Sequence, residues 1–300
     1  MAGVYIVADA PDTAAELVTY AKEWGKPSTV VVLCGNPSAY AQTGADALAH
    51  LAADDPVPEN YLRPLASYLR QEQAEIVLTG AHEDELTVAA GVAGYLDCEM
   101  ATDARNVGLT DDCVRIERSV YGGMVVDVQD LPLPCVVSVA PGKKELASGA
   151  VSVKEVPVET SGVVSRESSE SRKAGSVDLT KAERVVCVGL GVKKREDLEP
   201  VRQLAQALGA ELACTRSIVE ERQWMDKERY IGITGSILSA KLYLAVGVSG
   251  QVQHMYGVRD VDTIMAIDTD EKAPIFKNAD YGVVGDLYQV VPALLKACGE

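Results

Sequence analysis

The chain is 300 residues long, is 47% hydrophobic and 24% charged, and carries a formal net charge of -16 at pH 7. This length is enough for two domains that each bury a core, and the acidic balance argues against nucleic acid or an anionic membrane surface as a partner. The sequence has no run of 18 apolar residues and no basic segment before its first apolar run, so we expect a cytoplasmic protein without membrane insertion.

The seven cysteines are widely spaced and include no CxxC pair. A zinc site and a thioredoxin-type redox couple both need closely spaced cysteines, so we predict neither and assign no metal ligands. Buried free thiols are the simplest interpretation of these residues.

The first half of the chain alternates predicted strands and helices. Apolar, β-branched runs predict strands at 4–9, 28–35 and 74–80, and apolar residues at helical spacing predict helices at 11–24, 61–73 and 85–96. From residue 114 to 129 the pattern alternates by twos around two adjacent glycines, which predicts a hairpin, and 134–142 predicts a further strand. This order is typical of an α/β fold with a doubly wound parallel sheet and an antiparallel addition.

A polar, serine-rich segment then separates this half from a second strand and helix alternation. Segment 160–183 has almost no apolar periodicity, and strands are predicted near 184–191, 210–215, 241–247, 262–268 and 280–286. Helices are predicted at about 196–208 and at 288–297. We therefore predict an N-terminal α/β domain at 1–165, a linker at 166–183 and a flavodoxin- or Rossmann-like domain at 184–300.

Three turns that follow predicted strands of the second half are candidate binding segments. VGLGVKK (188–194) begins like a dinucleotide fingerprint, but Lys194 stands where the third glycine belongs. ACTR (213–216) places Thr215 and Arg216 at the carboxyl end of a strand, and IGITG (231–235) places Thr234 between glycines. Taken singly, the first and third segments are better explained as ordinary turns, and Arg216 is equally well explained as a salt-bridged surface residue.

Two further segments complete the set of candidates. VGVSGQVQH (246–254) runs from a strand through a glycine turn into a predicted helix, where backbone N–H groups can meet an anion. The alternative explanation is that Ser249 only caps a helix and that His254 has a structural role. The last segment, 267–286, has acidic side chains near strand ends, for which solvation is the simpler explanation. A serine hydrolase is excluded because no GxSxG motif occurs.

In this order the motifs resemble the α subunit of the electron transfer flavoproteins, and the region from Leu242 to Leu287 carries several of them at the family's spacing. The segment RQWMDKERYIGITG (222–235) resembles the FixB-type branch. The resemblance implies an FAD-based electron carrier that forms a heterodimer with a β subunit, which its N-terminal domain contacts. It also implies electron transfer between an acyl-CoA dehydrogenase or reductase, or NADH, and a quinone-linked oxidoreductase or ferredoxin.

By this resemblance, Ser249 and Gly250 meet the FAD phosphates, Gln251 to Gln253 line the cofactor, and His254 reaches the N1/C2 edge of the flavin. A hydrogen-bond donor at that edge stabilises negative charge on reduced flavin. Arg216 lies over the ring system, where a positive charge raises the reduction potential.

The resemblance also assigns the remaining contacts. Thr234, in the turn from Ile231 to Thr234, matches the hydroxyl donor to flavin N5, and Thr215 keeps the hydroxyl of the usual serine. Asp286 and Leu287 match positions near the adenosine. The full set of predicted FAD contacts is Thr215, Arg216, Ile231, Gly232, Ile233, Thr234, Ser249, Gly250, Gln251, Val252, Gln253, His254, Asp268, Asp286 and Leu287.

Three positions depart from the family pattern. Leu190 stands where many relatives have arginine, Ile233 where glutamine is common, and Asp268 where asparagine is usual. An ionised Asp268 near phosphate groups would weaken FAD binding. The alternative is therefore a flavin-free, nucleotide-binding scaffold subunit of a dehydrogenase complex. An independent NAD-dependent dehydrogenase would need a complete glycine fingerprint, which is missing.

Overall fold

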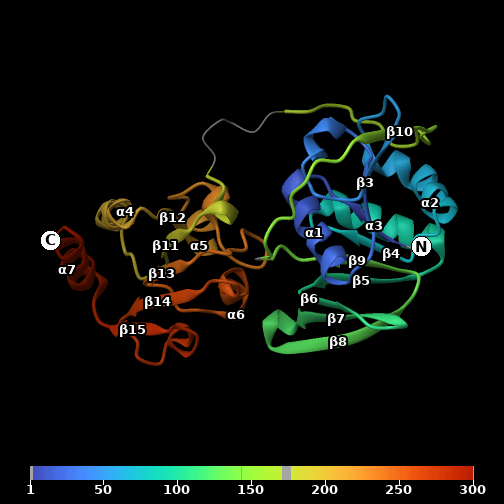
Figure 1. Cartoon of the computed structure of the whole chain (residues 1–300). Helices are drawn as coiled ribbons and strands as arrows, with labels where there is room; N and C mark the ends of the chain where they lie inside the picture. The colour runs from blue at the N-terminus through green and yellow to red at the C-terminus, as the bar shows by residue number, and fades with distance from the viewer. Residues whose placement is uncertain (1–2, 143, 171–176, 300) are drawn as a thin grey trace. The chain divides into compact units, whose positions relative to one another are not determined.

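The protein forms two compact units, Met1–Glu170 and Ser171–Glu300, in a computed structural model that describes residues 3–142, 144–170 and 177–299 (Figure 1). Part of the predicted linker, residues 171–176, lies outside the described residues. Leu179, which was also assigned to that linker, is buried in the core of the C-terminal unit. The division of the chain at 1–165, 166–183 and 184–300 stays a prediction.

A seven-stranded parallel sheet forms the centre of the N-terminal unit. Its order is β10-β3-β2-β1-β4-β9-β5. The strands are β1 (Val4–Val7), β2 (Ser28–Val32), β3 (Ala47–Ala52), β4 (Ile76–Thr79), β5 (Glu99–Ala104), β9 (Cys135–Val139) and β10 (Val153–Pro157). The central strands β1, β4 and β9 are buried along their whole length, as expected for a parallel sheet that is covered on both faces.

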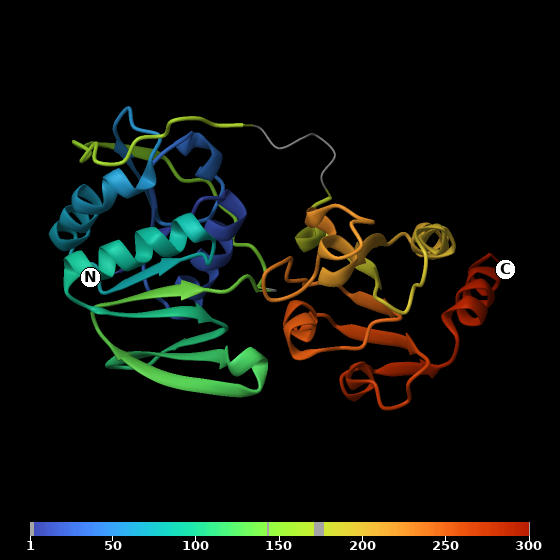
Figure 2. The same ribbon diagram turned by 180° about the vertical axis from the view of Figure 1, so that it is seen from behind.

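Helices cover the two faces of this sheet, as Figures 1 and 2 show from opposite sides. Helix α1 (Pro11–Glu23) packs its Leu17 and Val18 into the core on one face. Helices α2 (Leu62–Gln71) and α3 (Glu83–Leu96) pack Leu65 and Val92 into the core on the other. Each helix buries one apolar stripe, so the periodicity that predicted the helices also decides how they pack.

The predicted antiparallel addition is a three-stranded sheet, β6 (Asn106–Leu109), β7 (Cys113–Val120) and β8 (Val125–Pro132). Val114, Ile116 and Leu131 are buried, whereas Val126 and Val128 are exposed, so the alternation has one buried and one open face. The turn between β7 and β8 is a short 3-10 helix, Tyr121–Gly123, which lies at the glycine pair of the predicted hairpin.

The C-terminal unit contains five parallel strands in the order β12-β11-β13-β14-β15. They are β11 (Arg184–Val188), β12 (Glu211–Cys214), β13 (Leu242–Val246), β14 (Thr263–Asp268) and β15 (Tyr281–Val284). Helices α4 (Leu198–Ala207) and α7 (Leu287–Cys298) and the short helix α5 (Arg216–Glu220) pack on one face. The other face is covered mainly by loops and by short helices, including α6 (Val252–Met255). This strand order is that of flavodoxin-like sheets, so the predicted fold class is confirmed.

Four strands were not predicted from the sequence: β3, β5, β6 and β10. Strand β3 has the sequence ALAHLA, which is rich in residues that are uncommon in strands. Strand β10 lies at the edge of its sheet and is largely exposed, so it lacks an apolar run. Both segments are strands because neighbouring strands pair with them, and not because their own residues have a high strand propensity.

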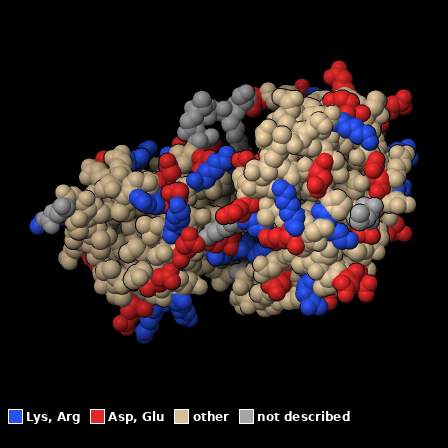
Figure 3. Space-filling model, viewed as in Figure 1, with Lys and Arg blue, Asp and Glu red and all other residues tan. Residues whose placement is uncertain are grey.

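Charges of both signs are mixed on the surface. Figure 3 shows Lys and Arg side chains among the Asp and Glu side chains on the face of the N-terminal unit in view, so the excess of acidic residues forms no single acidic field there. Within the part of the chain that the structure describes, every helix is too short or too polar to cross a membrane.

A close backbone contact shapes the carboxyl ends of β11 and β13. A Cβ atom added at Gly189 would lie 2.3 Å from the carbonyl oxygen of Gly247, and one at Gly191 would lie 2.6 Å from the Cα of Gly247. The Gly191 N–H donates to the Gly247 carbonyl at 3.0 Å, and Gly247 itself has a φ of 63°. Only residues without a side chain fit where these two loops meet.

We expect Gly189→Ala to destabilise the C-terminal unit by roughly 1–3 kcal/mol, because backbone atoms must move to admit the methyl group. Urea unfolding followed by Trp224 fluorescence in a Trp24→Phe background measures this. The matched control is Gly94→Ala, at an exposed helical position of the N-terminal unit with open space around it. The control should leave the urea midpoint of the Trp224 fluorescence transition unchanged. Equal shifts of this midpoint in both variants would contradict the close contact.

Candidate functional site

The two strands that meet at this glycine contact also mark the switch point of the C-terminal sheet. From β11 the chain first adds β12 on one side and then β13 on the other. Ligands of open α/β sheets bind outside the carboxyl ends of the strands at such a point. The residues that follow β11, β12 and β13 are therefore placed at the sheet edge where a ligand site is expected.

A cavity of about 580 Å³ lies at this edge. It is lined by Gly189, Leu190, Gly191, Thr215, Arg216, Ser217, Tyr230, Ile231, Ile233, Gly247, Val248, Ser249, Gly250, Gln251, Gln253, His254 and Asp268. Ten of the fifteen predicted FAD contacts are in this set, although they come from four separate segments of the sequence. The size is within the range usual for cofactor and small-molecule sites.

Two buried polar atoms of the cavity lining are left for a ligand. Thr215 Oγ1 and His254 Nδ1 are both buried and have no hydrogen-bond partner among the described residues. Unsatisfied buried polar atoms are uncommon in folded proteins because each costs free energy. A ligand that hydrogen-bonds would satisfy them, so the residues present fit a polar cofactor such as FAD.

His254 is held in an apolar setting. It is 8% exposed, and its Nε2 lies 2.7 Å from the hydroxyl oxygen of Tyr243 on strand β13. Burial lowers the pKa of His254 to about 4, and the backbone of Ile231 only partly opposes this shift. The imidazole is therefore neutral near pH 7, and it can offer a ligand a hydrogen bond but not a positive charge.

Arg216 and Asp268 are the charged members of the lining. The Arg216 guanidinium is exposed and lies 2.8 Å from Glu220 one helical turn later, an ion pair that raises the pKa of Arg216. Exposed pairs of this kind contribute little stability, so the arginine can turn toward a ligand at small cost. Asp268 accepts a hydrogen bond from the Asp270 N–H at 3.0 Å.

The turn that follows Tyr230 is fixed by backbone hydrogen bonds. The Ile231 N–H donates to the Cys214 carbonyl at 3.1 Å, and the Ile233 N–H donates to the Gln253 carbonyl at 2.9 Å. These bonds tie the turn to β12 and to the segment before His254. The Thr234 hydroxyl lies 3.1 Å from the Tyr230 hydroxyl, so it already has a partner within the turn.

Five predicted contacts lie outside the cavity lining: Gly232, Thr234, Val252, Asp286 and Leu287. Gly232 and Thr234 are adjacent to lining residues, and Val252 is exposed between two of them. Asp286 caps helix α7 by accepting the Tyr288 N–H at 3.0 Å. Leu287 is buried in the core and packs near Gly247.

Several lining residues were not predicted as contacts. Gly189 and Gly191 belong to the incomplete glycine fingerprint, and that motif was the signal that could have included them. Tyr230 also lines the cavity; it directly precedes the IGITG turn, within the segment 222–235 that resembles the FixB-type branch. Helix α6 is a single turn, so the helix predicted after Ser249 is much shorter than the sequence suggested.

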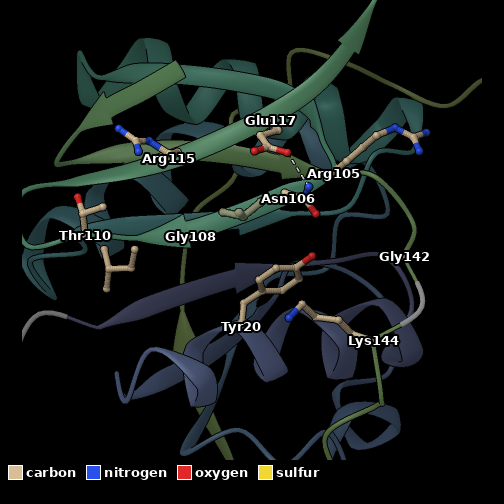
Figure 4. Close-up of a pocket in the computed structure, with 11 residues that line it drawn as sticks. Tyr20, Arg105, Asn106, Gly108, Thr110, Arg115, Glu117, Gly142 and Lys144 are labelled. Atoms are coloured by element: carbon tan, nitrogen blue, oxygen red, sulfur yellow. Dashed lines mark hydrogen bonds between the residues drawn. The ribbon is translucent and has the colours of Figure 1, made fainter. Parts of the chain in front are cut away.

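A second cavity, of about 500 Å³, lies in the N-terminal unit between strand β6 and helix α1 (Figure 4). Two of its cations have anionic partners: Arg115 forms a 2.7 Å pair with Asp130, and Lys144 pairs with Glu23 at the Tyr20 ring. The Asn106 amide donates to Glu117 at 2.7 Å, which Figure 4 shows as a dashed line. The predicted FAD contacts are all in the other unit.

The low pKa of His254 predicts a dependence of stability on pH. The unfolded chain, with the ordinary value of 6.5, binds the proton more tightly than the folded chain. The contribution to stability is therefore complete above about pH 6.5 and is lost as the pH falls toward 4, a loss of roughly 3 kcal/mol. We expect His254→Gln to lose less stability than the wild type over this interval in urea unfolding. Parallel losses in the two proteins would contradict a buried, neutral ring.

Comparisons with known proteins show the family of this chain. Residues 178–259 match the electron transfer flavoprotein FAD-binding domain, and residues 7–161 match the electron transfer flavoprotein domain. The chain is 36% identical to YdiR of Escherichia coli (strain K12), with 97% of this chain and 96% of that protein covered. It is 35% identical to the protein FixB of Salmonella typhimurium (strain LT2), with 98% and 97% covered. The chain therefore belongs to the electron transfer flavoprotein family as an α subunit, a redox carrier with an FAD-binding domain that pairs with a β subunit.

Proposed function

We propose that the C-terminal cavity holds FAD and that this flavin passes electrons between an acyl-CoA dehydrogenase or reductase, or NADH, and a quinone-linked oxidoreductase or ferredoxin. The observation that carries the proposal is the convergence of ten predicted contacts on one cavity at the switch point of the sheet. FAD supplies the electron chemistry when it is bound. The protein's own residues bind it, orient it and set the charge around it.

The cavity offers two kinds of stabilisation for a flavin that gains negative charge. Arg216 brings a full positive charge to the rim, and His254 brings a neutral hydrogen-bond donor within a buried setting. A fixed donor in a region of low dielectric interacts more strongly with developing charge than the same group in water. Together these groups favour reduced over oxidised flavin.

The remaining predicted contacts have roles that their positions support. Ser249 and Gly250 follow β13 at the switch point, where phosphate groups of nucleotides commonly bind. Thr215 supplies the buried hydroxyl, and Gln251 and Gln253 supply exposed amides at the rim. Thr234, Val252 and Asp286 are exposed, so cofactor atoms that extend beyond the cavity can reach them. Leu287 acts through packing against the glycine contact.

We assign the β-subunit contact to the N-terminal unit. The hairpin of β7 and β8 supports this, because Tyr121, Met124, Val126 and Val128 are all exposed there. Apolar side chains gathered on the open face of a small sheet are typical of protein interaction surfaces. The assignment is compatible with a cofactor site in the other unit.

Two departures from the family pattern bear on affinity. Leu190 lines the cavity and is 49% exposed, so it offers apolar surface where many relatives place a cation. Asp268 adds a carboxylate to the same lining. Both weaken the attraction for an anionic cofactor, and they are the observations that favour a flavin-free scaffold subunit as the second candidate function.

The decisive experiment is purification of the chain from its native cells together with whatever binds it. We expect a yellow complex with a β-sized companion, from which acid releases FAD, at one FAD per pair or two if the β subunit also binds a flavin. The visible spectrum before and after acid release measures the content. A colourless complex that does not take up added FAD would contradict the electron-carrier function and would favour the flavin-free scaffold subunit.

Asp268→Asn tests the charge of the cavity. Removing one negative charge beside an anionic ligand should tighten FAD binding about fivefold to tenfold, a gain of about 1 kcal/mol. Equilibrium titration of the apoprotein with FAD, in complex with its β subunit, measures the change. Glu271→Gln removes the same charge from an exposed position of the following loop, outside the cavity lining. Equal effects of the two variants would show that only overall charge matters.

A further inference from the structure

Tyr243 contacts the candidate FAD site only through another residue. It lies on the central strand β13, is 0% exposed, and is absent from the cavity lining. Its hydroxyl oxygen is 2.7 Å from Nε2 of His254, which does line the cavity. Any effect of this tyrosine on a bound ligand must therefore pass through the histidine ring.

The hydrogen of this short contact belongs to the tyrosine. Burial raises the pKa of Tyr243 well above its ordinary value of 10.0 and lowers the pKa of His254 to about 4, so both groups are neutral near pH 7. A phenol O–H is a stronger hydrogen-bond donor than a neutral imidazole N–H, and an imidazole nitrogen is a good acceptor. The Tyr243 O–H accordingly donates to Nε2.

Cys187 supports this direction from the neighbouring strand β11. Its thiol donates to the Val188 carbonyl at 3.9 Å, and complete burial raises the pKa of the thiol, which keeps it protonated. The sulfur is therefore at most a weak acceptor for the Tyr243 O–H, and it competes poorly with the imidazole nitrogen. The opposite direction would make sulfur, a weak acceptor, the partner of the tyrosine O–H while an imidazole nitrogen is available.

A neutral imidazole that accepts at Nε2 carries its hydrogen at Nδ1. That nitrogen is buried and makes no hydrogen bond of normal geometry among the described residues, although the Ile231 backbone lies near the ring and favours a hydrogen on it. It is therefore the ring nitrogen that a ligand can satisfy. We infer that Tyr243 is a positioning residue that fixes His254 as the Nδ1–H tautomer and so presents a neutral N–H donor to the flavin. This inference rests on the proposed FAD site.

Tyr243→Phe tests the inference, because it removes the hydroxyl and keeps the buried ring. Nitrogen-15 NMR of the ring nitrogens in the FAD-free protein distinguishes the tautomers, and only three histidines have to be assigned. We expect wild-type His254 to show a protonated Nδ1 and an unprotonated Nε2, and the variant to show hydrogen shared between both nitrogens. Tyr61→Phe removes the hydroxyl of a buried tyrosine of the N-terminal unit, which donates to the Ala53 and Asp55 carbonyls, and should leave the His254 signals unchanged.

A wild-type signal with the hydrogen at Nε2, or identical His254 signals in wild type and Tyr243→Phe, would overturn the inference. In the FAD-loaded complex we expect Tyr243→Phe to weaken FAD binding about tenfold and to lower the midpoint potential. If FAD binds but neither affinity nor potential changes, the inference is wrong and the proposed function stands. If the tautomer is as expected but the wild-type complex binds no FAD, the tautomer assignment stands, whereas the proposed function and the role of Tyr243 toward the flavin fail.

Discussion

The approach of Gly189 and Gly191 to Gly247 is the contact on which the candidate site depends. Strands β11 and β13 are hydrogen-bonded neighbours, but the chain leaves them in opposite directions, first to β12 and later to β14. The loops that leave these strands must therefore separate immediately above a tightly packed sheet. Glycine at the three positions allows the two backbones to touch before they diverge, and the residues that follow line the space between them.

The polar groups that line this space form two sets, one charged and one buried and neutral. Arg216 and Asp268 are charged and lie at the open side, where water screens their effect. His254 and the Thr215 hydroxyl are buried and neutral, and their strength comes from low dielectric and fixed orientation. A cofactor that gains one negative charge can be stabilised by both sets, so its potential depends on the buried geometry as well as on the visible charges.

Much of the fold could be predicted from the sequence, because local pattern and tertiary environment agree in the central strands. Runs such as those at β1, β2 and β11 are apolar and β-branched, and they are also buried on both faces. Strands β3 and β10 could not be predicted, since their residues have little preference for strands and depend on pairing with each other. The hairpin of β7 and β8 was predicted because its alternation by twos is visible locally.

The site was predicted through family motifs, and the fold brings ten of the fifteen predicted residues to one cavity. The motifs did not single out Tyr230 or Tyr243, because the side-chain contacts of these residues with Thr234 and His254 depend on how the turns fold. Nor could they show that Leu287 is buried in the core, which follows from the packing of α7 beside the glycine contact. Short motifs therefore predict which segments approach the ligand, whereas packing decides which side chains face it.

Hydrogen–deuterium exchange of the complex with and without FAD tests most directly where the cofactor binds. Bound FAD should slow exchange at four of the segments that line the cavity, 189–191, 215–217, 230–233 and 247–254, and should leave the hairpin of β7 and β8 unchanged. Protection confined to the N-terminal unit, with no change in these four segments, would contradict the central claim that the C-terminal switch point holds the flavin.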